Sequence, residues 1–138
     1  MKLIIGITVG VIVLLVGAIW LSSTLQKVDS EIISRSGLHW HTQLMIYVKG
    51  ERIEIPHNIG IGAVHMPMHT HEDLPTIHLE FGGVVKKRDL TLGQFFKIWD
   101  KEFDSFGPNV KMTVNGNENT ELGSYQMKDG DKIELRYE

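Results

Sequence analysis

The sequence HWHTQLMIYVKGERIEI, residues 39–55, alternates polar and apolar side chains on both sides of a Lys49–Gly50 pair. Such alternation around a pair of residues that includes glycine predicts a β-hairpin with a two-residue loop. The loop sets a register that pairs Val48 with Glu51, Ile46 with Ile53, and Leu44 with Ile55. In this register the aliphatic side chains share one face, which Trp40 extends, and we expect that face to be buried.

The opposite face of the first strand carries two histidines. His39 and His41 are two residues apart and point to the same side as Gln43, Met45 and Tyr47. Their Cα atoms should lie about 6.6 Å apart, which lets both imidazoles converge on one metal ion. The alternative is that both histidines lie on a solvent-exposed face without a ligand.

A second stretch, HMPMHTHEDLPTIHLE at residues 65–80, contains four histidines, two methionines and three carboxylates. If the four residues EDLP form a turn, a hairpin pairs His71 with Thr76 and His69 with His78. Three histidines then share one face, and directly opposed Cβ atoms lie about 5 Å apart. The apolar face would carry Thr70, Ile77 and Leu79. This arrangement suits three ligands around one metal ion, and a His69–His78 polar pair without an ion is the alternative.

The histidines do not have equal weight as candidate ligands. The predicted metal ligands are His69, His71, His78, His39 and His41. His57 and His65 are more typical of loop positions. The local pattern leaves open whether the two histidines of the first hairpin join the second cluster or form a separate site.

Three further side chains are secondary candidates. Met66 and Met68 offer thioethers, which favour Cu(I) over zinc, and core packing is their alternative role. Glu80 has the strand parity of His78, so it is the best-placed carboxylate to bind the ion or to hydrogen-bond a ligand. A surface ion pair is the alternative for this glutamate.

Copper is the metal that the composition favours. The chain has no cysteine, which excludes disulfides and thiolate metal sites. An all-imidazole site suits copper, zinc, nickel or iron, and copper stands highest in the divalent stability order. Two histidines with one carboxylate are also typical of non-haem iron sites. We therefore predict a bound copper ion, with zinc or iron as alternatives.

The N-terminal region contains an uncharged apolar segment, LIIGITVGVIVLLVGAIWL, at residues 3–21. At about 1.5 Å per helical residue, its 19 residues can cross a hydrocarbon core of about 30 Å. A cleaved signal peptide is the alternative, but small residues should then follow the apolar region, where Ile19, Trp20 and Leu21 stand. We therefore expect an uncleaved signal-anchor helix, with the lipid bilayer as its partner.

The expected organisation is a single-pass protein of the cell membrane. It comprises a transmembrane helix at residues 1–21, a linker at 22–36 that is either a stalk or a helical continuation, and a metal-binding domain at 37–138. The two-residue tail ahead of the apolar segment favours an extracytoplasmic location for that domain. Without Lys2 the chain has 13 basic and 17 acidic residues, a net charge of −4. An acidic domain is a poor nucleic-acid binder, because phosphate contacts require clustered Lys and Arg.

The remaining sequence predicts the scaffold. Thr91 and Gln94 form a capping-box pattern ahead of an apolar stripe at Leu92, Phe95, Phe96 and Trp99, which predicts a short helix over about 92–101. Turn pairs at Asn115–Gly116 and Asp129–Gly130 border further strands. The fold class is therefore α+β: one small mixed sheet, a single short packed helix, and an inserted histidine-rich hairpin.

Two resemblances accompany these motifs. The order of hairpin, helix and two further strands resembles the β-grasp arrangement of ubiquitin-like domains. The stretches HTHED, TIHLE and LTLGQFFKIW, within about residues 38–100, resemble an uncharacterised family of prokaryotic membrane-anchored or secreted proteins with HTHD, GIIHIE and FTLGQFFDIW stretches. This resemblance implies one fold and a shared use of His69, His71 and His78, and it names no reaction. Leu74 and Pro75 depart from the glycine-containing turn of that pattern.

Three functions fit these observations. The leading hypothesis is a tethered metal-binding protein that serves as a copper carrier, buffer or accessory subunit of a membrane-bound metalloprotein. The second is a metalloenzyme in which three histidines hold zinc, copper or iron, and Glu80 or Asp73 acts as a base. The third is a metal-free interaction domain whose histidines respond to pH. Nothing in the chain resembles a nucleophile triad or a phosphate-binding loop.

Overall fold

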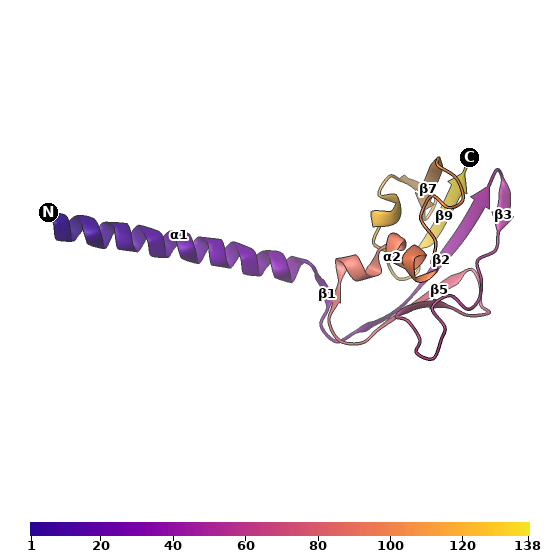
Figure 1. Cartoon of the computed structure of the whole chain (residues 1–138), viewed down its shortest axis with the longest axis horizontal. Helices are drawn as coiled ribbons and strands as arrows, with labels where there is room; N and C mark the ends of the chain where they lie inside the picture. Colours follow the sequence, from indigo (N-terminus) through magenta and orange to yellow (C-terminus); the bar gives the residue numbers. More distant parts are fainter. The chain divides into compact units, whose positions relative to one another are not determined.

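The protein is described by a computed structural model that gives the backbone of all 138 residues and the side chains of residues 1, 6–27 and 30–138. The chain divides into two compact units, Met1–Ile32 and Ile33–Glu138. The first unit is helical and the second combines a mixed sheet with a short helix (Figure 1). The α+β class predicted from the sequence is confirmed.

The first unit consists mainly of helix α1 (Lys2–Ser30). Within the described residues, Gly6–Lys27 is long and apolar enough to cross a membrane, with a mean hydropathy of 2.2 and no buried residues. The helix continues through most of the predicted linker, which is the helical alternative stated above. The side chains of Leu3, Ile4 and Ile5, at the start of the predicted apolar segment, lie outside the described residues.

The larger sheet of the second unit has the strand order β4-β5-β2-β9-β7-β8, and β3 pairs with β2 beyond the end of β5. The strands are β2 (Leu38–Val48), β3 (Glu51–Ile53), β4 (Met68–Thr70), β5 (Thr76–Phe81), β7 (Val110–Val114), β8 (Asn117–Asn119) and β9 (Lys132–Tyr137). β9 runs parallel to β2, whereas the other ladders of this sheet are antiparallel. A two-stranded sheet joins β1 (Ile32–Ser34) and β6 (Val85–Lys86), and 3₁₀ turns cover Lys87–Leu90 and Leu122–Ser124.

The first predicted hairpin is confirmed near its turn. Lys49 and Gly50 have φ values of 51° and 87°, as a type I′ turn requires, and β2 pairs with β3 at Ile46↔Ile53, Tyr47↔Arg52 and Val48↔Glu51. The predicted pairing of Leu44 with Ile55 is wrong. β3 ends at Ile53, and the backbone N–H of Leu44 instead donates to the carbonyl of Pro75, 2.9 Å away. β5 therefore takes over the edge of β2 that β3 leaves free.

The second predicted hairpin has the expected register at His69 and His78, but β4 ends at Thr70, so the predicted pair of His71 with Thr76 is not part of the ladder. β4 pairs with β5 at Met68↔Leu79, His69↔His78 and Thr70↔Ile77. Thr70, Ile77 and Leu79 are fully buried, so the apolar face of this hairpin lies in the core as predicted. β5 also pairs with β2 over Leu38–Gln43, which the local pattern did not reveal. This second pairing makes β5 a central strand of the site described below.

Helix α2 (Leu92–Ile98) packs its apolar stripe into the core of the second unit. Its N-terminus is capped by Thr91, whose hydroxyl accepts a hydrogen bond from the backbone N–H of Gln94 at 3.3 Å. Leu92, Phe95 and Phe96 are buried among side chains of the sheet, which confirms the predicted packed helix. The helix ends three residues before the predicted 101, because Asp100 adopts a φ of 57°.

Asp100 gives a testable prediction about this helix end. The N–H groups of Lys101 and Asp100 donate to the carbonyls of Phe96 and Lys97 at 3.0 and 3.1 Å, which is a Schellman motif with a non-glycine residue at the left-handed position. Asp100→Gly should therefore raise the free energy of unfolding by about 0.5–1 kcal/mol, because glycine adopts this φ without steric cost. Urea denaturation would measure the change, and a destabilised variant would contradict this account of the helix end.

Candidate metal centre

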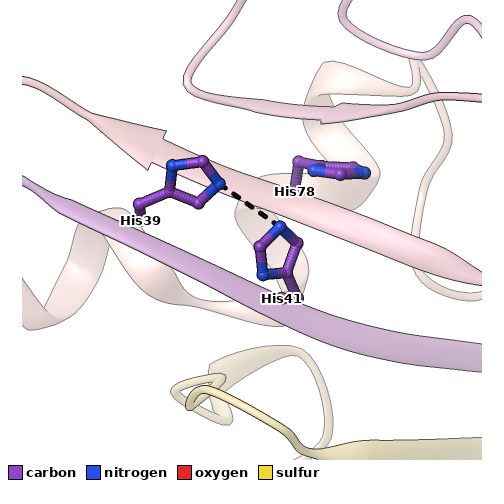
Figure 2. A group of neighbouring side chains, drawn as sticks. All are labelled: His39, His41 and His78. Carbon is purple, nitrogen blue, oxygen red and sulfur yellow. Dashed lines mark hydrogen bonds between the residues drawn. The ribbon is translucent and has the colours of Figure 1, made fainter.

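Three neighbouring strands bring the predicted ligands onto one face of the sheet. In the ladder β4-β5-β2, His78 of β5 is paired with His69 of β4 on one side and with His41 of β2 on the other. His39 of β2 is paired with Glu80 of β5. Figure 2 shows His39, His41 and His78 projecting from the two adjacent strands toward one another. The histidines of the first hairpin and those of the second hairpin therefore lie on one surface, a question that the sequence left open.

The imidazole rings make a continuous chain of contacts, which we call the histidine band: His39, His41, His65, His69, His71 and His78. Ring centroids lie 4.9 Å apart for His39–His41, 4.8 Å for His41–His78, 5.4 Å for His69–His78, 4.8 Å for His69–His71 and 5.0 Å for His71–His78. His65 joins through His69, with centroids 5.6 Å apart, although its loop position gave it low weight in the sequence. All five predicted histidine ligands are members of the band.

Two groups of three ligand atoms stand out among the side chains that the structure describes. One group is His39, His41 and His78, and the other is His69, His78 and Glu80; within each group the atoms lie within 4.8 Å of one another. Metal–nitrogen bonds of about 2.0–2.1 Å place two tetrahedral ligands about 3.4 Å apart. The Nε2 atoms of His39 and His41 are 3.3 Å apart, so this pair already has the separation that one ion requires.

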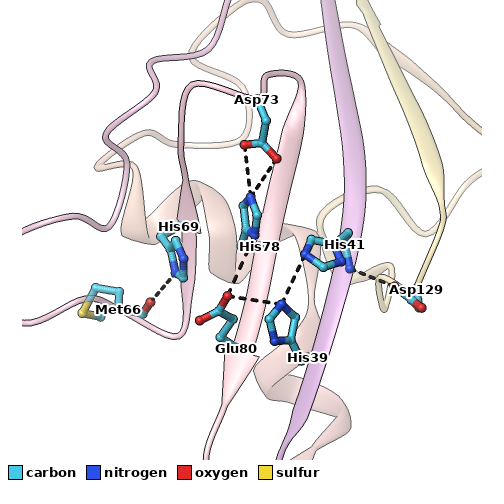
Figure 3. Close-up of polar contacts among 8 residues, drawn as sticks. All are labelled: His39, His41, Met66, His69, Asp73, His78, Glu80 and Asp129. Carbon is cyan, nitrogen blue, oxygen red and sulfur yellow. Dashed lines mark hydrogen bonds and ion pairs between the residues drawn. The ribbon is translucent and has the colours of Figure 1, made fainter.

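Hydrogen bonds fix which nitrogen of two histidines is free. Nδ1 of His69 lies 3.0 Å from the carbonyl oxygen of Met66, and because a carbonyl only accepts, Nδ1 carries the proton and Nε2 has a free lone pair. Nε2 of His78 lies 3.0 and 3.1 Å from the two carboxylate oxygens of Asp73, so Nε2 is the donor and Nδ1 is free (Figure 3). Carbonyl and carboxylate partners of this kind orient histidines in protein metal sites.

Glu80 belongs to the second group and also approaches His39 of the first group. Its Oε1 is 3.3 Å from Nε2 of His39 and 4.0 Å from Nδ1 of His78 (Figure 3). The side chain of Glu80 is exposed, as are those of His39 and His41. A carboxylate in this position can bind an ion directly or hold the neighbouring imidazoles in place. It is thus positioned for either role that its strand parity predicted.

Burial lowers the pKa of one member of the band, His69. His69 has 2% of its surface exposed, and its pKa is lowered mainly by this burial, with further lowering by His71 and His78. The imidazole of His69 is therefore neutral at pH 7, which is the form that binds metal. The hydrogen bond from His78 lowers the pKa of Asp73, so this carboxylate stays ionised as a partner for His78.

The structure separates the two candidate methionines. Met68 is fully buried in the core, on the opposite side of β4 from His69, and the structure does not bring it to the band. Met66 is 45% exposed and contributes its carbonyl oxygen to His69, while Figure 3 shows its sulfur on the side away from that histidine. Asp73, which the sequence suggested as a base in an enzyme, lies 3.0 Å from Nε2 of His78 and orients this histidine.

The polypeptide turn after Met127 holds β2 at the level of the histidines. The backbone N–H of His41 donates to Oδ1 of Asp129 at 2.9 Å, and the N–H of Gly130 donates to the carbonyl of His41 at 2.8 Å. The hydroxyl of Thr42 donates to the carbonyl of Lys128 at 2.9 Å. These bonds fix the backbone of β2 where His41 faces His78, and nothing in the local sequence pattern indicated them.

Comparison of the chain with protein-family models, with curated proteins and with solved structures gave no significant match.

Proposed function

We propose that this chain is a membrane-tethered metal-binding protein, with copper as the leading ion, that acts as a carrier, buffer or accessory subunit. The histidine band is the observation that supports this proposal. Six imidazoles converge on one sheet face, and two groups of three ligand atoms have separations that small side-chain rotations can close around an ion. Histidine is neutral and a ligand near pH 7, so such a cluster is suited to metal binding.

The donor set supports copper ahead of zinc. Imidazole nitrogens with one carboxylate suit borderline divalent ions, and copper stands above zinc in affinity for a given set of nitrogen and oxygen donors. The free Nε2 of His69 and the free Nδ1 of His78 provide two such nitrogens in a fixed orientation. Zinc and iron remain the alternative ions.

The exposure of the ligands supports a carrier or buffer rather than an enzyme. His39, His41 and His71 are exposed, and His39 and Glu80 line a shallow, open groove. An enzyme would hold its ion in a concave pocket with a shielded base. Asp73, one of the two candidate bases, is exposed and already paired with His78. An open site lets a partner protein, such as a membrane-bound metalloprotein, approach the ion.

The tether is part of this proposal. Helix α1 has the length and apolar composition of a membrane span, which is consistent with a single-pass protein whose metal-binding domain lies on the extracytoplasmic side. The strand order β3-β2-β9-β7-β8, with a parallel β2–β9 pair, is consistent with a β-grasp-like core into which the β4–β5 hairpin is inserted. We also propose, on the stretches HTHED, TIHLE and LTLGQFFKIW, that the chain is related to the prokaryotic membrane-anchored or secreted proteins with HTHD stretches.

Metal retention by the full chain in detergent micelles tests this function. After exposure to copper, zinc or iron and desalting, elemental analysis should find about one equivalent of copper in the wild type. A variant with His41→Ala, His69→Ala and His78→Ala, one histidine from each strand of the band, should retain essentially none. His57→Ala, which removes a histidine outside the band, is the matched control and should retain copper as the wild type does.

The other outcomes of this experiment overturn parts of the proposal. Preferential retention of zinc or iron would replace copper as the ion and would favour the metalloenzyme. Absence of retained metal in the wild type would overturn metal binding and would leave the histidines as pH-responsive surface groups.

A further inference from the structure

We infer that the histidine band holds one ion at a time and passes it between two overlapping positions that share His78. This inference rests on the proposed metal binding and describes how the ion moves. The outer position is formed by His39, His41 and His78, and the inner position by His69, His78 and Glu80. Because His78 belongs to both groups, the ion can move from one to the other without leaving the protein.

The hydrogen bond to Asp73 makes the two positions mutually exclusive. Nε2 of His78 is engaged by both carboxylate oxygens of Asp73, at 3.0 and 3.1 Å, which leaves only the lone pair on Nδ1 for an ion. One lone pair binds one ion. Two ions could be held with complete ligand sets only if His78 used both nitrogens, and Asp73 opposes this arrangement.

The two positions differ in their access to solvent. The side chain of His39 is 62% exposed and His41 is also exposed, so an incoming hydrated ion or a partner protein meets these two residues directly. In the inner position the side chain of Glu80 is 44% exposed, but His69 is almost completely buried and its ring is oriented by the carbonyl of Met66. The outer position should therefore exchange ions quickly, and the inner position should release its ion slowly.

Glu80, a ligand of the inner position, also lies close to the outer position and can accept the ion from it. Its Oε1 lies 3.3 Å from Nε2 of His39 in the outer position and 4.0 Å from Nδ1 of His78, the shared ligand. An ion bound to His78 can exchange His39 for Glu80 and then His41 for His69, one ligand at a time. Each step keeps at least two ligands on the ion, which avoids the large cost of a bare cation. The chemical class of the cargo is a divalent cation that accepts imidazole nitrogen and carboxylate oxygen, and copper is the probe.

Copper titration of the full chain in micelles, followed by electron paramagnetic resonance, tests the shared ligand. The wild type should bind one equivalent of Cu(II). His39→Ala/His41→Ala, which removes the outer pair, and His69→Ala/Glu80→Gln, which removes the inner pair, should each still bind one equivalent with different spectra. Release to a chelator should be slower than wild type for the outer-pair variant and faster for the inner-pair variant.

His78, the residue shared by the two positions, should be required for copper binding in both of them. His78→Ala should lower copper affinity on the order of 100-fold or more, since loss of even a second-shell partner of a ligand costs about 10–100-fold. His78→Gln, which keeps a polar side chain of similar length, should bind equally weakly, and circular dichroism should show that both variants are folded. Retention of wild-type affinity by a folded His78 variant would overturn the inference.

Two further results would overturn the inference while leaving metal binding intact. Two equivalents of copper in the wild type would mean that the positions are independent. Loss of all copper from only one of the pair variants would mean that a single position exists. A wild type that binds no copper would instead overturn the proposed function, so the two failures are distinguishable.

Discussion

Gly60→Ala is expected to destabilise the second unit by about 3 kcal/mol and to disturb the inner metal position. Gly60 has a φ of 70°, a conformation that costs an alanine about 1–2 kcal/mol. A Cβ atom at this residue would also collide with the backbone carbonyl oxygen of Met68 and would lie 3.2 Å from Cβ of His69 and from Cγ2 of Ile98. A backbone atom cannot rotate away, so the loop at residues 54–67, which contains Gly60, must move away from β4. This movement adds a repacking cost of about 1–3 kcal/mol.

Hydrogen bonds connect this loop to the residues on both sides of His69, so the substitution should also affect the metal site. The N–H of Met66 donates to the carbonyl of Gly60 at 2.8 Å, and the N–H of Thr70 donates to the carbonyl of Ile59 at 3.1 Å. These bonds hold both sides of His69, whose Nδ1 depends on the carbonyl of Met66. Displacing the loop should therefore accelerate copper release from the inner position as well as lower the free energy of unfolding.

Gly62→Ala is the matched control for this prediction. Gly62 lies in the same loop, and a Cβ atom there would meet only the carbonyl oxygen of Val64, at an ordinary 3.8 Å. Its substitution should change stability by less than about 0.5 kcal/mol. Urea denaturation of the full chain in micelles, followed by near-ultraviolet circular dichroism, measures both variants. Equal denaturation midpoints for the two variants would show that the packing of Gly60 against β4 is not required.

Local sequence patterns predicted the parts of the fold that neighbouring residues determine. The Lys49–Gly50 turn and strict alternation fixed the pairing of β2 with β3, and the same reasoning gave the His69↔His78 pair. The hydroxyl of Thr91 and the apolar stripe behind it located α2. Each of these features depends on contacts between residues close in sequence, which is why periodicity and turn chemistry were sufficient.

The pairing of β5 with β2 depends on contacts between distant residues, and alternation alone does not encode it. One signal was present in the sequence: the first predicted strand runs from His39 to Val48 and the second only from Glu51 to Ile55, so part of the edge of the first strand needed another partner. That pairing places His41 opposite His78 and turns two candidate clusters into one. Asp73 was missed as a partner of His78 for a similar reason, because its role depends on how the turn at Leu74 and Pro75 folds back.

Asp131→Ala is expected to lower the free energy of unfolding by about 3–4 kcal/mol. Asp131 is 5% exposed, and its carboxylate accepts hydrogen bonds from the hydroxyl of Tyr125 at 2.7 Å, the N–H of Lys128 at 2.8 Å and the amide of Asn115 at 3.0 Å. Hydrogen bonds to a charged group contribute about 1.5–3 kcal/mol each, and removal of the carboxylate leaves buried donors unsatisfied. The turn that holds β2 beside His41 depends on these bonds.

The pH dependence of stability provides an independent measure of the same network. Burial, together with the hydrogen bond to Asp131, raises the pKa of Tyr125 above its ordinary value of about 10. A pKa that is higher in the folded protein favours the protonated form, so this contribution to stability is complete below pH 10 and is lost as pH rises further. Part of that alkaline loss should disappear in Asp131→Ala, because the raising of the Tyr125 pKa by Asp131 is then absent.

Asp129→Ala is the control that tests whether the hydrogen bonds to Asp131, and not simply a negative charge in the turn, stabilise the protein. Asp129 carries the same charge two residues away, but it is exposed and accepts one backbone N–H, from His41. Its removal should cost no more than about 1 kcal/mol. Urea denaturation at pH 7 and at pH 11 measures the free energy of unfolding of the wild type, Asp131→Ala and Asp129→Ala. If Asp131→Ala loses no more stability than Asp129→Ala, the buried carboxylate does not hold the turn, and the position of His41 must be set by the β2–β5 and β2–β9 ladders alone.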